Sequence, residues 1–76
     1  MTSKTLDRAL AIANRHATQR EMSDEYHLKL SDLLQQSGYT PWGFISLFVT
    51  LKKQGWTHRR GRAFIRAPIG WTPKRE

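Results

Sequence analysis

Apolar residues near the start of the chain recur at the spacing of an amphipathic helix. They fall at i, i+3, i+4, i+7 and i+11, and they are Leu6, Ala9, Leu10, Ala13 and Ala17. This pattern predicts one apolar stripe on a helix that runs from about Lys4 to Arg20. Because most of the stripe consists of small side chains, the helix can lie close against another helix.

Residues 23–38 can be interpreted in two ways. Ser23 suits an N-cap and the two acids after it suit the positive end of the helix dipole, which predicts a single helix over residues 24–37. The second interpretation ends a short helix near residue 26 or 27, leaves a brief extended stretch at 27–30, and starts a new helix with Ser31 as its N-cap. In both, Gly38 ends the helix, because glycine takes a left-handed turn at little cost.

The next helix has a clear start and an unusual composition. Thr40 is its predicted N-cap and Pro41 its first residue, and the helix runs to Gln54 before Gly55. Its apolar residues are Trp42, Phe44, Ile45, Leu47, Phe48, Val49 and Leu51. A helix that is apolar on nearly all sides is expected to be buried on nearly all sides. Either the flanking elements wrap it, or part of it forms a dimer interface.

Residues 56–67 predict a β-hairpin. Strands at 56–58 and 62–67 are joined by a two-residue turn, Arg60-Gly61, and this pairing sets Arg59 opposite Arg62 and Thr57 opposite Phe64. One predicted face is mainly apolar and can cover the helices: Trp56, His58, Ala63, Ile65 and Ala67. The other face is rich in arginine: Thr57, Arg59, Arg62, Phe64 and Arg66. In the opposite register Phe64 becomes a packing residue.

The chain after residue 68 is expected to be irregular, since Pro68, Gly70 and Pro73 stop regular structure. We expect Trp71 to fold back onto the core. Trp42, Trp56 and Trp71 are all expected to anchor the core. Residues 1–76 then form one domain with flexible ends at about 1–3 and 69–76.

The net charge of +7 lies entirely in residues 52–76. The bases there are Lys52, Lys53, Arg59, Arg60, Arg62, Arg66, Lys74 and Arg75, against the single acid Glu76, whereas residues 1–51 are balanced. Such a basic end attracts polyanions, of which nucleic acid is the commonest. An acidic protein surface or anionic lipid is the competing partner, and a solvated edge ribbon is the interpretation without a ligand.

The composition argues against several other classes. The chain has no cysteine, and His16, His27 and His58 lack metal-ligand spacing. No nucleophile, phosphate-loop or Rossmann motif is present, so no catalytic residue, cofactor or metal is expected, and we do not expect an enzyme. The apolar run at 42–51 is too short to span a membrane, and the N-terminus does not look like a secretory signal. A cytoplasmic location is therefore expected.

The order helix, extended piece, helix, turn, helix, hairpin resembles the winged helix-turn-helix domain of many bacterial and phage regulators. The resemblance rests on LKLSDLLQQSG at 28–38, YTPWGFISLFVTLKKQGW at 39–56 and THRRGRAFIRA at 57–67. It implies an α+β fold, mainly α, with three helices and a C-terminal hairpin as the wing. It also implies that the third helix lies in the major groove of DNA while the wing contacts phosphates or the minor groove.

Carried onto this chain, the resemblance implies a set of DNA-binding residues. The groove-facing stripe of the third helix would be Gly43, Ser46, Thr50 and Lys53, and the wing would supply Arg59, Arg60, Arg62 and Arg66 with Phe64 stacking or wedging at a base. Lys52, Lys74 and Arg75 would lie at the margins. The stripe is thin, because no Arg, Asn or Gln in the helix is placed to read a base edge, which argues against sequence-specific reading.

These features favour a small transcriptional regulator or accessory factor that binds double-stranded DNA, without membrane association. A homodimer through the helix at 4–20 is a further expectation. The alternative is a phage or mobile-element inhibitor or adaptor that binds an acidic host protein, which the apolar third helix favours. A third interpretation is RNA binding, with Phe64 and Arg66 stacking on unpaired bases.

Overall fold

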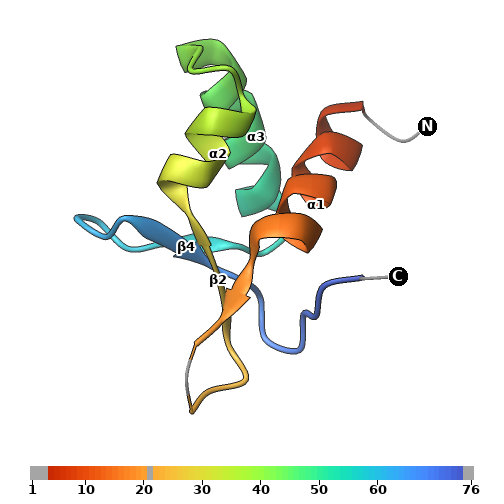
Figure 1. The fold of residues 1–76 in the computed structure, drawn as a ribbon, viewed down its shortest axis with the longest axis vertical. Helices are drawn as coiled ribbons and strands as arrows, with labels where there is room; N and C mark the ends of the chain where they lie inside the picture. The colour runs from red at the N-terminus through yellow and green to blue at the C-terminus, as the bar shows by residue number, and fades with distance from the viewer. Residues whose placement is uncertain (1–3, 21, 75–76) are drawn as a thin grey trace.

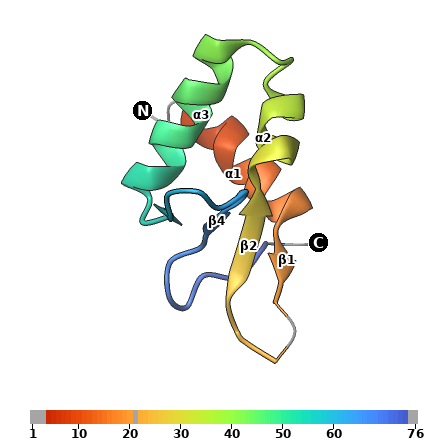
Figure 2. The same ribbon diagram turned by 90° about the vertical axis from the view of Figure 1, so that its left-hand side faces the viewer.

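The computed structural model describes residues 4–20 and 22–74. Its elements are α1 (Lys4–His16), β1 (Thr18–Gln19), β2 (Tyr26–Lys29), α2 (Leu30–Gln36), α3 (Pro41–Lys53), β3 (Thr57–His58) and β4 (Phe64–Arg66). The strands form one antiparallel sheet in the order β1-β2-β4-β3. The three helices gather to one side of this sheet (Figures 1 and 2). The expected α+β fold with three helices is confirmed, but the sheet has four strands rather than the two of the predicted hairpin.

The first helix is shorter than the sequence predicts. α1 ends at His16, and Thr18 and Gln19 form β1, paired with His27 and Tyr26 of β2. The helical prediction for residues 17–20 was therefore wrong. Pairing with β2 supplies the backbone partners that a longer helix would have supplied. Ala17 remains fully buried, so the apolar stripe continues into the core beyond the end of the helix.

Residues 23–38 follow the second interpretation in part. The extended stretch is β2, so the single helix over 24–37 was wrong, and no helix precedes the strand in residues 22–25. Ser23 accepts a hydrogen bond from the Glu25 N–H at 3.2 Å in a turn and caps no helix. Ser31 is not an N-cap either, because α2 already begins at Leu30. The extended conformation is favoured over the single helix because it buries Leu28 completely, whereas the single helix would leave Leu28 outside its apolar face.

The third helix is confirmed, and its end depends on a glycine. At the start of α3 the Thr40 hydroxyl donates to the Ser37 carbonyl at 3.0 Å and makes no cap hydrogen bond. At the other end, Gly55 has φ +100°, and the Trp56 N–H donates to the Leu51 carbonyl at 3.1 Å. This is the Schellman arrangement, and it turns the chain so that Trp56 enters the core.

The turn of the hairpin is where the sequence predicts it. The Arg62 N–H donates to the Arg59 carbonyl at 3.0 Å, and Gly61 between them has φ +80°. The strand register was wrong by two residues, because Thr57 pairs with Arg66 and not with Phe64.

The register shifts because β4 pairs with β2 on its other side. Phe64 lies opposite Lys29, and the Leu30 N–H donates to the Ala63 carbonyl at 3.0 Å, so this part of β4 extends past the end of β3. A shift of two residues leaves each side chain on its predicted side of the strand. Ala63 is nevertheless exposed, because it lies in the loop beyond the sheet.

The core lies between the helices and the inner side of the sheet. Its buried apolar residues are Ala9, Ile12, Ala13, Ala17, Leu28, Leu33, Leu47, Leu51, Trp56, Ile65 and Ala67. The Trp71 ring packs edge-on against Tyr26 and Trp56, with ring centroids 5.5 and 5.0 Å apart, so the predicted fold-back is confirmed. The described part of the tail is irregular, as expected, and the Lys74 N–H reaches Asn14 Oδ1 at 3.0 Å.

The flanking elements do not wrap α3 on all sides, so the first of the two expectations was wrong, whereas a dimer interface on part of the helix stays a prediction. Trp42 is 81% exposed, and Ile45 and Val49 are 48% and 42% exposed. Trp42 is therefore not a core anchor. Neighbouring elements bury only one side of α3, where Leu47 and Leu51 lie. No helix within residues 4–20 and 22–74 is long and apolar enough to cross a membrane.

We expect Leu28→Ala to lower the free energy of unfolding by about 2–5 kcal/mol, because it leaves a cavity under the central strands. Urea denaturation measures this change. Val49→Ala removes apolar atoms from an exposed helical site and should change the value by less than about 0.5 kcal/mol. Equal effects of the two substitutions would contradict the packing described above.

Candidate nucleic-acid interface

The side of the sheet that faces away from the helices carries the polar side chains of the strands. The strand register aligns four of them in one row across the sheet: Thr18, His27, Arg66 and Thr57. Lys29 and Phe64 form the next row. Between the two rows, Leu28 and Ile65 point the other way and are fully buried. We call this polar side the outer face.

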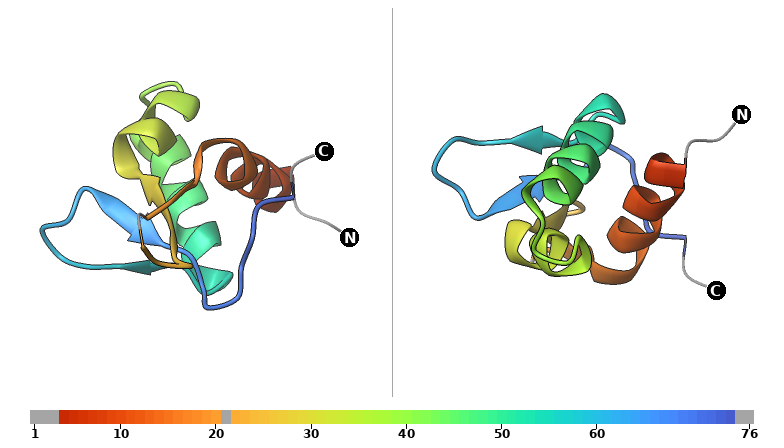
Figure 3. Two further views of the ribbon diagram at one scale, coloured as in Figure 1. Left: turned by 60° about the horizontal axis from the view of Figure 1, so that its bottom comes forward. Right: turned by 90° about the horizontal axis from the view of Figure 1, so that it is seen from above.

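An open depression of about 500 Å³ lies on the outer face. Its lining residues are Arg20, Glu25, His27, Thr57, Arg59, Arg62, Phe64 and Arg66. Arg59 and Arg62 come from the loop between β3 and β4, which extends away from α1 and from both termini (Figure 3). Arg20 follows β1 on the other edge of the sheet. Among the described residues, the depression therefore collects arginines from three parts of the chain and one acid, Glu25.

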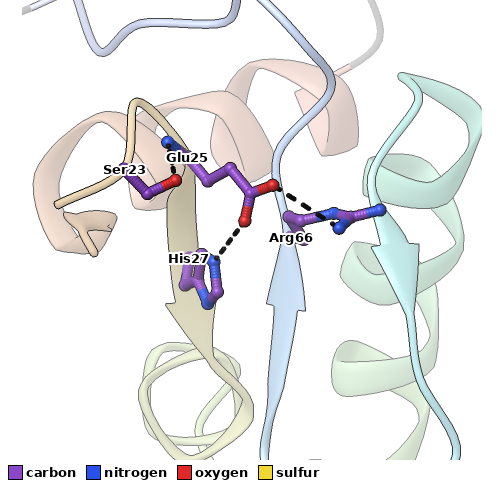
Figure 4. Close-up of polar contacts among 4 residues, drawn as sticks. All are labelled: Ser23, Glu25, His27 and Arg66. Carbon is purple, nitrogen blue, oxygen red and sulfur yellow. Dashed lines mark hydrogen bonds and ion pairs between the residues drawn. The ribbon is translucent and has the colours of Figure 1, made fainter. Parts of the chain in front are cut away.

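Glu25 neutralises part of this charge. Its carboxylate oxygens lie 3.6 Å from Arg66 Nη1 and 3.5 Å from His27 Nε2 (Figure 4). The Arg66 and Glu25 side chains are 39% and 44% exposed, so their pair contributes at most about 1 kcal/mol to stability. Arg59, Arg60 and Arg62 have no ion pair with any acid among the described residues. Within the depression, the arginines without an ion pair to a described acid are thus Arg20, Arg59 and Arg62.

Two aromatic rings lie together in the depression. The His27 and Phe64 ring centroids are 4.5 Å apart, with an interplanar angle of 31°. The rings belong to β2 and β4, the two central strands, so their positions depend on the pairing of those strands. Arginines and a ring pair on one open surface suit a phosphate chain that carries planar bases.

The structure brings only some of the sequence-predicted residues together. Arg59, Arg62, Phe64 and Arg66 share the depression, and Arg60 is exposed in the turn beside them. Lys52 and Lys53 are exposed at the end of α3. Lys52 is close to β3, because its Nζ lies 5.5 Å from the centre of the Phe48 ring, whose edge contacts His58.

The rest of the predicted set lies elsewhere. Ser46 and Gly43 border a hollow beside Lys4 and Arg8 of α1, and the Thr50 hydroxyl donates to the Ser46 carbonyl at 2.7 Å. Lys74 is tied to α1 by its backbone. Arg75 lies outside the described residues. The stripe proposed for the DNA groove is therefore directed partly toward α1, and Trp42, Ile45 and Val49 occupy the exposed side of α3.

Sequence reasoning missed Arg20, His27 and Lys29 as members of this surface. The signal for the last two was present, because Tyr26-His27-Leu28-Lys29 alternates between inward and outward positions with the period of a strand. Arg20 was missed because the first helix was extended through it. The apolar stripe of α1 packs within the domain, and dimerisation through this helix stays a prediction.

The described residues contain no group of three His, Asp or Glu side chains arranged to hold a metal ion. No protein-family model, curated protein or solved structure matches the chain. The function is therefore inferred from the geometry and charge of the outer face.

We expect Glu25→Gln to strengthen binding to heparin, a sequence-free polyanion, because it removes the one described acid that lines the depression and releases Arg66. Elution from a heparin column should require more salt than for the parent protein, and the free energy of unfolding should change by less than about 1 kcal/mol. Asp7→Asn on α1 makes the same change in net charge and is the control. Earlier elution of Glu25→Gln than of the parent would contradict this electrostatic account.

Proposed function

We propose that the protein is a small DNA-binding regulator or accessory factor that contacts duplex phosphates through the outer face and the arginine loop at residues 59–62. The observation that carries the proposal is the group of arginines at this loop, which have no counter-charge among the described acids. Unpaired arginines on a protruding loop attract and neutralise phosphates, and the counterions released from DNA favour binding.

The order of elements supports a winged-helix arrangement for this function. α1, β2, α2, α3 and the β3–β4 hairpin follow in the order on which the resemblance rests, and β1 is an addition. In this arrangement the loop at 59–62 is the wing. Lys52 lies near the hairpin through the Phe48 contacts, and Lys53 follows it at the exposed end of α3.

The proposed binding depends little on base sequence. The exposed side of α3 presents Trp42, Ile45 and Val49. The indole N–H of Trp42 is the single hydrogen-bonding group among these three side chains. Arginine contacts to phosphates position a protein on DNA but carry no direct sequence information. A steep dependence of affinity on salt is the expected property.

We expect the double variant Arg59→Ala/Arg62→Ala to weaken binding to a random duplex and to reduce the slope of log affinity against log salt by up to about 2. Fluorescence anisotropy between about 50 and 200 mM salt measures both quantities. Alanine keeps the backbone hydrogen bond of the turn. Lys4→Ala/Arg15→Ala removes the same charge from exposed positions of α1 and should leave the slope nearly unchanged. Equal losses in the two variants would show that only net charge matters.

A second function, binding of an acidic protein partner, is supported by the exposed side of α3. Trp42, Ile45 and Val49 form an apolar row that ends at Lys52 and Lys53. The chain has no acid between Asp32 and Glu76, so the charged residues that follow this row in the sequence are all basic up to Arg75. Such a surface suits a partner that is apolar in its centre and acidic at its rim.

The double variant Trp42→Ser/Val49→Ser separates the two functions. If the arginine loop supplies the DNA affinity, duplex binding should change by less than about threefold, which is under 1 kcal/mol. A larger loss would place α3 in the groove. The protein-partner function requires instead that the parent fail to bind duplex at about 50 mM salt, and that Trp42 emission shift to the blue when an acidic amphipathic peptide is added.

A further inference from the structure

The His27–Phe64 ring pair differs in position from the other ring contacts of the described chain. Those contacts join Tyr26, Trp56 and Trp71 at the core, and Phe44, Phe48 and His58 beside α3. His27 and Phe64 instead lie on the outer face and line the depression. The His27 side chain is only 16% exposed, with its Nε2 buried, and Phe64 is half-buried, so only part of each ring can contact a ligand that enters from solvent.

The depression has the size and charge of a site for one nucleotide. Its volume of about 500 Å³ falls within the range of about 300–1,000 Å³ that is usual for small-ligand pockets. The ring pair provides aromatic surface for stacking, in which the Phe64 ring is the apolar member. Arg59 and Arg62 provide positive charge at the loop end, whereas Glu25 lies at the other end, beside Arg66. This asymmetry places a phosphate at the loop end, away from the carboxylate.

A paired base cannot reach such a surface, because both of its faces are covered by neighbouring bases in the duplex. An unpaired base has a free face, and base stacking on aromatic side chains is the usual means by which proteins hold single strands. We propose that the depression binds one unpaired nucleotide, with its base on the His27–Phe64 pair and its phosphate at Arg59 and Arg62. This inference rests on the proposed function, because both require a nucleic-acid ligand, and it makes a duplex with a single-stranded end the preferred ligand.

Anisotropy with three labelled probes tests the proposal: a blunt random duplex, the same duplex with a six-nucleotide dT tail, and dT12 alone. The parent protein should bind the tailed duplex about 5- to 100-fold more tightly than the blunt one. Phe64→Leu should lose this preference and bind the tailed and blunt duplexes with equal affinity, while Phe64→Trp should retain it. Phe44→Leu removes a ring that does not line the depression, and it should behave like the parent. Circular dichroism checks that each variant is folded.

Each outcome separates the nucleotide site from the duplex function. Equal affinity of the parent for blunt and tailed duplexes would overturn the site and leave the proposed function standing. A tail preference that survives Phe64→Leu would also overturn it, because charge alone would then explain the preference. Binding of dT12 that depends on Phe64, without blunt-duplex binding, would support the site and reject the duplex function. No binding of any probe would reject both.

The same nucleotide chemistry occurs in DNA and in RNA, and a fourth probe identifies the source. If rU12 binds more tightly than dT12, and if Phe64→Leu loses that binding, the unpaired nucleotide belongs to RNA. If dT12 binds at least as tightly, it belongs to single-stranded DNA. In both cases the dependence on Phe64 is what supports the site.

Discussion

The pairing of β2 with β4 is the interaction on which the rest of the structure depends. It joins residues 27–29 to residues 64–66, which are far apart in the chain, at the centre of the sheet. Because side chains alternate along a strand, the same three pairs place Leu28 and Ile65 in the core and His27, Arg66 and Phe64 on the outer face. One set of backbone hydrogen bonds therefore builds both the core and the candidate site.

The distribution of acids gives the outer face its character. Of the acids that the structure describes, only Glu25 lines the depression, and it is engaged with His27 and Arg66. The arginines of the loop are left without a described counter-charge, which a folded protein tolerates easily only where water or a ligand surrounds them. The exposed side of α3 differs, because its central residues are apolar and its charge is confined to Lys52 and Lys53. These two surfaces suit different ligands, and this is why a protein partner is retained as a second function.

Local chemistry made part of this architecture predictable from sequence. Pro41 and Gly55 bound α3, Gly61 places the turn, and the alternation in β4 separates Ile65 from Phe64 and Arg66. Long-range pairing was harder to foresee. The helical stripe of α1 gives no sign that Thr18 and Gln19 will pair with β2, and nothing in residues 56–67 alone shows that β4 has a second partner.

For the candidate site, the arginines of the hairpin were identified from charge alone, whereas Arg20, His27 and Lys29 required the sheet. The exposure of Trp42 also could not be foreseen, because an apolar helix does not reveal which of its sides its neighbours will cover. A single sequence therefore does not determine which residues join a site through tertiary strand pairing.

The most direct test is to map the amide chemical-shift changes of ¹⁵N-labelled protein on addition of a random DNA duplex at low salt. Shifts should concentrate at Arg59, Arg60 and Arg62 and extend across the outer face to His27 and Lys29. Shifts confined to α1, shifts confined to Trp42, Ile45 and Val49, or no shifts at all would contradict the proposal that the face built by β2 and β4 binds nucleic acid.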